Sequence, residues 1–397
     1  MTIINSILDT DFYKLTMMSA VLELFPNAQA VYKFKNRGST EFNNVFIEAL
    51  KTEIYDNMPK LFLTDDEYSW LKEKIRFFKP AYLEYLKNYR FDPEQVEFGL
   101  SDENDLWLTI KGPWHSTILY EVPLLAAISE LYFELIDTEW KKTDYEKEQY
   151  QKAREKADKL HKNKCYYADF GTRRRRSFEI QKRVISAFYD YNLPLEKKTF
   201  VGTSNVYFAK LWDTKAIGTC AHEWTQAMQA LESLNHCNYY AMQNWIKIFN
   251  TDLGIALSDS TTTKMFFKNF NRRLAMLYDG IRQDSGDPFE FTDNTITHYK
   301  KLNINPMSKF IIFSDSLDVE KAIQIKQYCE GKINCSFGIG THFSNDFKNS
   351  PALNMVIKIY SIDDFPVVKL SDSDGKEMGD PKAIEIMKWI IKNQLVK

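Results

Sequence analysis

The sequence predicts an α/β protein in which an irregular (β/α) barrel is joined by a second mixed α/β domain. Two observations support this fold. From about residue 165 onward, short apolar or β-branched runs each end in a polar tip, and each tip precedes a helix-like segment. The polar residues gather after the expected strands, as in barrels with an active site at the carboxyl ends of their strands. An open doubly wound sheet is the competing fold, but no GxGxxG motif follows a first strand.

The N-terminal and C-terminal segments are expected to form the second domain together. We place this domain at residues 1–135, completed by residues 349–397, and the barrel at residues 136–348. Residues 1–120 contain charged, aromatic segments such as DDEYSWLKEKIRFF, for which we expect helices. The segment VEFGLSDENDLWLTIKGPWHSTILYEV is predicted to form strands and turns.

Two further helices are expected before the first barrel strand. Pro123 opens the segment PLLAAISELYFELI, whose apolar spacing fits a buried helix with proline in its first turn. The stretch KKTDYEKEQYQKAREKADKLHKNK alternates charge over several turns, which indicates a solvated helix face.

Seven strand-and-tip units follow within about 180 residues, and this spacing predicts parallel βα repeats. The tips read YYADFGTRRRRS, TFVGTSN, KAIGTCAHE, LGIALSDSTTT, YDGIRQDSGDP, FIIFSDSLD and CSFGIGTHFSND.

Composition excludes several classes of protein. The chain has 397 residues, of which 44% are hydrophobic, so it can bury a large core. Its net charge of −2 provides no basic field for nucleic acid or an anionic membrane surface. No apolar run is long enough to span a membrane, and the N-terminus does not read as a signal peptide. Five cysteines without a CxxC pair favour a reducing, cytoplasmic location.

Aspartates occur repeatedly at the expected strand tips. Carboxylates that converge on the open end of a barrel repel each other unless a cation lies between them. Mg²⁺ with a phosphorylated ligand usually balances such a group of charges. The alternative is that an aspartate caps the following helix, which we consider equally well supported for Asp287 and Asp318. The aspartates concerned are Asp259, Asp284, Asp287, Asp315 and Asp318.

Two other tips suggest anion binding. The FGIG run before Thr341 offers backbone amides ahead of a helix, a geometry that can hold a phosphate, although glycine also serves ordinary turns. The arginines at 173–176 suit the anionic groups of a small substrate better than nucleic acid, because the whole chain is nearly neutral. If this tip is extended, alternate arginines point to opposite sides, and one or two of them reach the site. Phe170 precedes them and could stack on a flat ring, or fill the core.

His222 stands beside Glu223 in the tip GTCAHE. Position 226 is Gln, so the HExxH zinc motif is absent, and no second histidine lies at ligand spacing. A neutral imidazole can act as a nucleophile toward phosphorus. A buried structural histidine is equally consistent with the residues alone.

Taken in order, the motifs resemble the nicotinate phosphoribosyltransferase family of type II phosphoribosyltransferases over nearly the whole chain. The segments that carry the resemblance are LDTDFYKLTMMSAV, ILYEVPLLAAISE, DFGTRRRRS, GTSNVYFA, GTCAHEW, LGIALSDSTTT, IRQDSGDP, FSDSLD, FGIGTHFSND and VVKLSDSDGK. The resemblance implies transfer of phosphoribosyl from phosphoribosyl pyrophosphate to nicotinate, with Mg²⁺ as cofactor and ATP hydrolysis coupled to the step. It also implies that ATP phosphorylates the histidine of GTCAHE, which is His222.

The resemblance further implies roles for individual residues. His222, Arg282 and Asp284 would be catalytic. Tyr13 and Phe170 would hold the pyridine ring between them. The residues that would contact the other parts of the substrates are Arg173 and Arg175 for the carboxylate, Ser314, Asp315, Gly338, Gly340 and Thr341 for the 5′-phosphate, and Thr203, Ser204 and Asp259 elsewhere in the site.

Ser204 bears on which pyridine is used. Nicotinamide-using relatives carry an aspartate at this tip, and a serine does not repel a carboxylate, so nicotinate is favoured. Departures from the family pattern are Cys220, the fourth arginine, and the THF run, which leaves His342 without a role. A homodimer is allowed, and Tyr13 could act within its own chain or on a neighbour.

Three alternatives stay open on the sequence. A phosphoribosyltransferase for nicotinamide or quinolinate would share most of the motifs. A Mg²⁺-dependent barrel aldolase or hydrolase would need a lysine or paired carboxylates at a strand tip, which the sequence does not offer. The intact GTCAHE motif argues against a non-catalytic nucleotide-binding protein.

Overall fold

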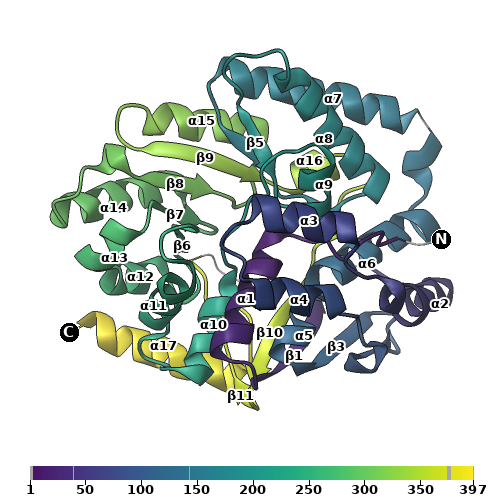
Figure 1. The fold of residues 1–397 in the computed structure, drawn as a ribbon, viewed down its shortest axis with the longest axis horizontal. Helices are drawn as coiled ribbons and strands as arrows, with labels where there is room; N and C mark the ends of the chain where they lie inside the picture. The colour runs from purple at the N-terminus through teal and green to yellow at the C-terminus, as the bar shows by residue number, and fades with distance from the viewer. Residues whose placement is uncertain (1–2, 39, 143, 373–376, 397) are drawn as a thin grey trace.

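The computed structural model describes residues 3–38, 40–142, 144–372 and 377–396. It contains two β-sheets of different character, together with helices (Figure 1). One sheet is parallel and comes from the middle of the chain. The other is antiparallel and combines strands from both ends of the chain. The mixed α/β class predicted from the sequence is therefore confirmed.

The parallel sheet has the strand order β5-β4-β9-β8-β7-β6. Its strands are β4 (Tyr167–Asp169), β5 (Phe200–Thr203), β6 (Ile255–Leu257), β7 (Gly280–Gln283), β8 (Phe310–Phe313) and β9 (Asn334–Ile339). All five pairings between neighbours are parallel, so the polar tips that follow these strands meet at one edge. Six of the seven predicted strand-and-tip units thus contribute a strand.

The seventh unit, KAIGTCAHE, forms no strand. Ala216 makes an isolated parallel bridge to Thr203. The chain then turns at Gly218, whose φ of 155° lies in the region that favours glycine. This segment runs between β5 and β6, where the Thr219 hydroxyl donates to the Ile255 carbonyl at 3.1 Å.

A closed barrel is not confirmed. Within the described residues, β5 and β6 are the two edges of the parallel sheet and do not pair with each other. The segment of residues 215–219 lies in the gap, but its irregular contacts do not make a continuous ladder.

The antiparallel sheet has the order β11-β10-β1-β3-β2. Its strands are β1 (Gln29–Asn36), β2 (Val96–Leu100), β3 (Leu106–Pro113), β10 (Met355–Ile362) and β11 (Phe365–Pro366). Strand β10 pairs with β1 over residues 355–362, so the C-terminal segment completes the sheet that the N-terminal segment begins. The domain limits at residues 135 and 349 stay a prediction.

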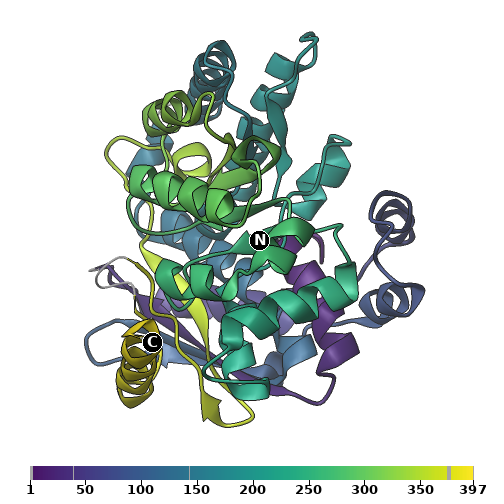
Figure 2. The same ribbon diagram turned by 90° about the vertical axis from the view of Figure 1, so that its left-hand side faces the viewer.

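Helices pack around the parallel sheet and on the face of the antiparallel sheet that carries its buried side chains (Figure 2). Those before β4 are α1 (Phe12–Leu24), α2 (Asn44–Thr52), α3 (Asp65–Lys74), α4 (Pro80–Asn88), α5 (Trp114–Thr117), α6 (Glu121–Leu135) and α7 (Tyr145–Lys162). Those after β4 are α8 (Phe178–Asn192), α9 (Val206–Leu211), α10 (His222–Leu231), α11 (Cys237–Phe249), α12 (Thr263–Asn269), α13 (Arg272–Leu277), α14 (Pro288–Lys301), α15 (Val319–Cys329), α16 (Thr341–Ser344) and α17 (Pro381–Val396).

The helices predicted around Pro123 and in the charged stretch are present as α6 and α7, and DDEYSWLKEK is α3. The expectation of strands and turns after Val96 is correct only as far as Pro113. From Trp114 the chain is helical, because α5 and α6 pack on the antiparallel sheet.

Helix α10 lies where the two sheets approach each other. It packs against β10 of the antiparallel sheet, while its first residue, His222, faces the tips of the parallel sheet. None of the described helices combines the length and apolar character needed to cross a bilayer. The five cysteines are buried and free.

Candidate active site

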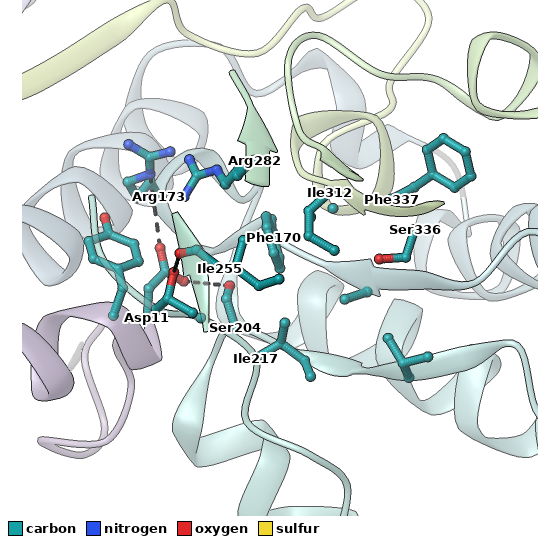
Figure 3. A pocket seen from close by; sticks show the side chains of 16 residues that line it. Asp11, Phe170, Arg173, Ser204, Ile217, Ile255, Arg282, Ile312, Ser336 and Phe337 are labelled. Atoms are coloured by element: carbon teal, nitrogen blue, oxygen red, sulfur yellow. Dashed lines mark hydrogen bonds and ion pairs between the residues drawn. The ribbon is translucent and has the colours of Figure 1, made fainter. Parts of the chain in front are cut away.

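A cavity lies at the carboxyl edge of the parallel sheet (Figure 3). We call it the ring cavity, and define it by the lining residues Asp11, Tyr13, Phe170, Arg173, Ser204, Arg282 and Gly338, together with apolar residues such as Ile217, Ile312 and Phe337. Polar side chains gather on one side of the cavity, where Asp11, Arg173 and Arg282 lie close together, and apolar side chains line the other. The chain's own Tyr13, from α1, is part of this lining.

Phe170 and Gly338 form one wall together. A Cβ atom added to Gly338 would lie 2.2 Å from Cε2 of Phe170, so only glycine lets the ring sit against strand β9. The predicted stacking position of Phe170 is therefore inside the ring cavity, and Gly338 supports the ring there.

Arg173 is the arginine of the RRRR run that reaches the ring cavity. Its Nε lies 3.9 Å from Asp11 Oδ2 and its Nη1 lies 3.7 Å from Glu121 Oε1, and both distances exceed hydrogen-bond length. The guanidinium thus faces two carboxylates without a close bond to either, and it retains donors for an anionic ligand.

The other three arginines point elsewhere. Arg175 is buried and binds Asp9 with both nitrogens at 2.7 and 2.9 Å, outside the lining of the ring cavity. Arg176 is buried over the ring of Phe133, and half-buried Arg174 has a pKa lowered to about 10 by burial and by its neighbour Arg173. Residues Thr172–Arg174 form a 3₁₀ turn, so the alternation expected of an extended tip does not apply.

The N-terminal segment closes the ring cavity beside Ser204. The Ser204 hydroxyl donates to Asp11 Oδ1 at 2.7 Å, and the Phe12 amide donates to the Ser204 carbonyl at 2.7 Å. Burial raises the pKa of Asp11. Thr203 points away from the cavity and donates to Asp169 at 2.9 Å, so it supports the tip from behind.

A second group of side chains surrounds His222. We call it the histidine centre, and it consists of His222, Asp259, Ser260, Asp284 and Lys369. The imidazole Nδ1 lies 3.0 Å from the Ser260 hydroxyl, while Nε2 lies 2.9 Å from both Asp284 Oδ2 and Lys369 Nζ. Burial, followed by the charge of Lys369, lowers the pKa of His222. The imidazole is therefore neutral at neutral pH.

The carboxylates of the histidine centre are held in place by their neighbours. Asp259 accepts from Ser285 at 2.6 Å and lies 3.5 Å from Lys369. Asp284 accepts from Ser314 at 2.6 Å and from Arg282 at 3.0 Å. Because Arg282 also lines the ring cavity, it joins the two parts of the site.

This arrangement fits a divalent cation. His222, Asp259 and Asp284 each offer one possible ligand atom, and these three atoms lie within 4.8 Å of one another. Within the described part of the chain, the buried Oδ1 of Asp259 accepts no hydrogen bond. Carboxylate oxygens are the ligands that Mg²⁺ prefers.

The remaining strand-tip aspartates have two different roles. Asp287 accepts from the amides of Phe289 and Glu290 at the start of α14, and Asp318 accepts from the amide of Lys321 at the start of α15. Both are helix caps. Asp315 lies half-buried after β8, and the Ser316 hydroxyl donates to it at 3.0 Å.

The predicted phosphate cradle lies at the end of β9. Gly340 precedes the short helix α16, which begins at Thr341. A Cβ atom on Gly340 would lie 3.0 Å from the Phe170 carbonyl, so this turn packs closely on the tip of β4. His342 is half-buried, and its own carbonyl accepts from Lys156.

Glu223 explains why an acid follows His222. It is buried and accepts from Lys14 at 2.5 Å, from Tyr32 at 2.5 Å and from Trp114 at 2.8 Å. These contacts attach the first turn of α10 to α1 and to the antiparallel sheet. Glu223 thereby positions the neighbouring imidazole instead of serving as a metal ligand.

Sequence reasoning missed Asp11 and Lys369. Asp11 lies in the motif LDTDFYKLTMM and Lys369 in VVKLSDSDGK, so the resemblance pointed to both segments but not to these residues. Residues 373–376 of the second motif lie outside the described residues. The barrel aldolase or hydrolase alternative was disfavoured because no lysine stood at a strand tip, yet Lys369 reaches the site from the C-terminal segment.

Comparison with protein families gives two matches. The model of the nicotinate phosphoribosyltransferase (NAPRTase) family matches residues 165–394, and the model of the NAPRTase N-terminal domain matches residues 8–129. The first range contains all six strands of the parallel sheet, and the second contains helices α1 to α5.

Individual relatives agree with this result. A nicotinate phosphoribosyltransferase of Methanosarcina mazei is 50% identical over 404 residues, covering 98% of each chain. The crystal structure of nicotinate phosphoribosyltransferase from Porphyromonas gingivalis has a TM-score of 0.93 at 37% identity, covering 98% of this chain and 100% of the other. A putative nicotinate phosphoribosyltransferase from Saccharomyces cerevisiae has a TM-score of 0.94 at 37% identity, covering 99% of each chain.

Proposed function

The chain belongs to the nicotinate phosphoribosyltransferase family, and we propose that it transfers phosphoribosyl from phosphoribosyl pyrophosphate to nicotinate, with ATP hydrolysis coupled through a phosphorylated His222. The products are nicotinate mononucleotide and pyrophosphate, a step of NAD synthesis from nicotinate. The observation that carries the coupled part is the histidine centre, where a buried, neutral imidazole faces two carboxylates and a lysine.

The phosphoryl acceptor is Nε2 of His222. Nε2 lies 2.9 Å from both the Lys369 ammonium, which donates to an unprotonated nitrogen, and the Asp284 carboxylate, which accepts only from a protonated one. The tautomer that we propose for attack is the one in which Nδ1 donates to Ser260 and the lone pair lies on Nε2. Attack by this lone pair on the γ-phosphorus of ATP forms the N–P bond as the bond to ADP breaks. Hydrolysis of the phosphohistidine then restores the free imidazole.

The surroundings of His222 suit the charge that arrives with the phosphoryl group. Lys369 offers a cation beside Nε2, and His222 is the first residue of α10, whose N-terminus has no side-chain cap. Free amides and the helix dipole favour an anion at that position. Asp259 and Asp284 would hold Mg²⁺, which when bound neutralises negative charge on phosphate oxygens.

The ring cavity provides the pyridine site. Phe170 and Tyr13 line it, and Arg173 keeps donors for the carboxylate of nicotinate. Arg175 is unsuitable for this role, because Asp9 occupies its guanidinium. Gly340 and Thr341 remain our proposal for the 5′-phosphate, together with Gly338, Ser314 and Asp315.

The transfer itself needs no protein nucleophile. The pyridine nitrogen attacks C1 of the ribose as the bond from C1 to the pyrophosphate oxygen breaks. Arg282 lies between the ring cavity and the histidine centre, and its bond to Asp284 lets a change at His222 reach the substrate. Positive charge there stabilises the leaving pyrophosphate.

An assay of pyrophosphate release tests the proposal. Phosphoribosyl pyrophosphate would be supplied with nicotinate, nicotinamide or quinolinate, each with and without ATP. We expect nicotinate to react fastest and ATP to raise its turnover. Faster reaction with nicotinamide or quinolinate would favour the alternative phosphoribosyltransferases, and no release with any pyridine would contradict the transferase activity of this chain.

Two further properties belong to the same proposal. The buried free thiols suit a reducing compartment, so we place the enzyme in the cytoplasm. The sequence allows a homodimer, and light scattering coupled to size exclusion would measure the assembly. Tyr13 of the same chain lines the ring cavity, so the pyridine site does not require a neighbour's Tyr13.

A further inference from the structure

Arg173, itself half-buried, belongs to a mostly buried cluster of charges that extends away from the ring cavity. Glu121 lies 2.7 Å from Lys14, 2.8 Å from Lys358 and 3.7 Å from Arg173. Glu223 shares Lys14, and Asp11 shares Arg173. The cations of this cluster are Lys14, Lys358 and Arg173, and the anions are Asp11, Glu121 and Glu223.

Three positive and three negative groups make this cluster neutral before any ligand enters, and the charge of the neighbouring Arg282 is balanced by Asp284 at 3.0 Å. A nicotinate bound to Arg173 adds one more carboxylate. An unbalanced charge inside a protein is costly, and a titratable group nearby usually takes up or releases a proton instead. The cluster therefore has to gain a proton or lose affinity for nicotinate.

We propose that nicotinate binding is accompanied by protonation of Asp11, which makes Asp11 a specificity-determining residue of the ring cavity. This inference rests on the proposed function, since it assumes that the carboxylate of nicotinate meets Arg173. A neutral pyridine such as nicotinamide adds no charge and requires no proton.

The contacts of Asp11 single it out within the cluster. It is 2% exposed and lines the ring cavity, and its Oδ2 lies at 3.9 Å from the guanidinium that the ligand would take. Glu121 and Glu223 each lie within 2.7 Å of the ammonium of Lys14, a closer cation than any that faces Asp11. Burial alone would raise the pKa of Glu121, but Lys14 and Lys358 keep it well below its usual range.

Other titratable groups also face Asp11. From β4, Asp169 is buried and has a pKa raised to about 6 by burial, but it accepts from Gln181 and Thr203 and lies outside the ring cavity. From the turn after β4, Arg175 is held by Asp9 at 2.7 Å. Tyr13 belongs to helix α1, which begins directly after Asp11. Burial raises its pKa well above the usual value, so it stays neutral. None of these would meet the ligand's carboxylate as directly as Asp11.

Calorimetry of nicotinate binding tests the proposal. Titrations at pH 6.5 and 7.5 in buffers of different ionisation enthalpy give the number of protons taken up. At pH 6.5 we expect the wild-type protein to take up a large fraction of one proton with nicotinate and none with nicotinamide. The affinity for nicotinate should rise as the pH falls, because free protons then neutralise Asp11 more easily.

The variant Asp11→Asn keeps the shape of the side chain and removes its charge. It should bind nicotinate without proton uptake, with a pH-independent affinity that is roughly tenfold tighter than wild type at pH 7.5, the size of change that about 1.4 kcal/mol represents. Ser204→Ala is the companion variant. It removes the hydroxyl that donates to the Asp11 carboxylate, which raises the pKa of Asp11, so the pH range over which protons are taken up should move upward.

Three outcomes would overturn the proposal. They are wild-type binding of nicotinate without proton uptake, uptake that survives in Asp11→Asn, and weaker nicotinate binding in a folded Asp11→Asn protein. If the variant does not fold, the wild-type comparison of nicotinate with nicotinamide still decides. Failure of the proposed function looks different, because then nicotinate would not bind at all.

Discussion

The ring cavity and the histidine centre lie at the same edge of the parallel sheet, but their charges are partnered differently. Around Arg173 the nearest carboxylates stand at 3.7 and 3.9 Å, whereas around His222 the nearest groups stand at 2.9 to 3.0 Å. Loose partners leave donors available for a ligand. Close partners fix the orientation of a reactive ring. The first region is thus suited to recognition, and the second to chemistry.

The two neighbouring arginines provide the sharpest contrast between structural and ligand-binding charge. Arg175→Ala should leave the buried Asp9 carboxylate without its cation, which typically costs about 3–5 kcal/mol of stability. We expect a large fall in Tm, or loss of soluble protein, measured by thermal unfolding. A fully stable variant would show that Asp9 does not depend on this ion pair.

Arg173→Ala should lower Tm less than Arg175→Ala does, because this guanidinium lies 3.7 and 3.9 Å from its carboxylate neighbours and forms no bidentate pair, although its charge cluster loses one cation. We expect the KM for nicotinate to rise about 100-fold, which corresponds to about 2.7 kcal/mol for a lost charge-assisted contact. The KM for phosphoribosyl pyrophosphate should change little. Equal increases for both substrates would mean that Arg173 serves the phosphates.

Asp284→Asn probes the proposed cation site of the histidine centre. Loss of one charged ligand should raise the Mg²⁺ concentration for half-maximal activity about tenfold, with partial rescue at high Mg²⁺. Asp315→Asn is the matched control. It should weaken use of the donor substrate without moving the Mg²⁺ midpoint. An unchanged midpoint in Asp284→Asn would assign this carboxylate to positioning Arg282 and His222.

Lys369→Met should change the pH dependence of ATP-driven phosphorylation. Burial is the main reason why the pKa of His222 is lowered, and Lys369 is the next. Without that cation, Asp259 and Asp284 pull the pKa upward, so the imidazole becomes protonated at higher pH than in the wild type. We expect the acidic limb of the labelling rate to move up by about one pH unit. A limb that stays in place would show that Lys369 does not act on His222.

Much of the site was predictable because parallel strands bring their carboxyl ends together. Phe170, Ser204, Arg282 and Gly338 all follow or end such strands, and the structure gathers them around one cavity. Lys369 could not be found in this way. It arrives from the C-terminal segment after the antiparallel sheet, where no periodic pattern points toward the parallel one.

Two other differences between the sequence prediction and the structure have local causes. The alternation rule for extended chain placed Arg173 and Arg175 on one side, but Thr172–Arg174 form a 3₁₀ turn that separates them. The irregular barrel was expected from seven similar tips, yet the segment before GTCAHE lacks the backbone ladder of a strand. Its turn at Gly218 instead carries the chain toward α10, so that His222 begins that helix.

Labelling with γ-labelled ATP and Mg²⁺ tests the central claim, that His222 is the phosphoryl acceptor, most directly. The wild-type protein should take up an acid-labile, base-stable label, as expected for a phosphoramidate, and should lose it when nicotinate and phosphoribosyl pyrophosphate are added. A folded His222→Asn protein should take up no label and hydrolyse no ATP, while retaining some ATP-independent transfer. Undiminished labelling of that variant would contradict the account, and a variant that unfolds would show that His222 is a structural histidine.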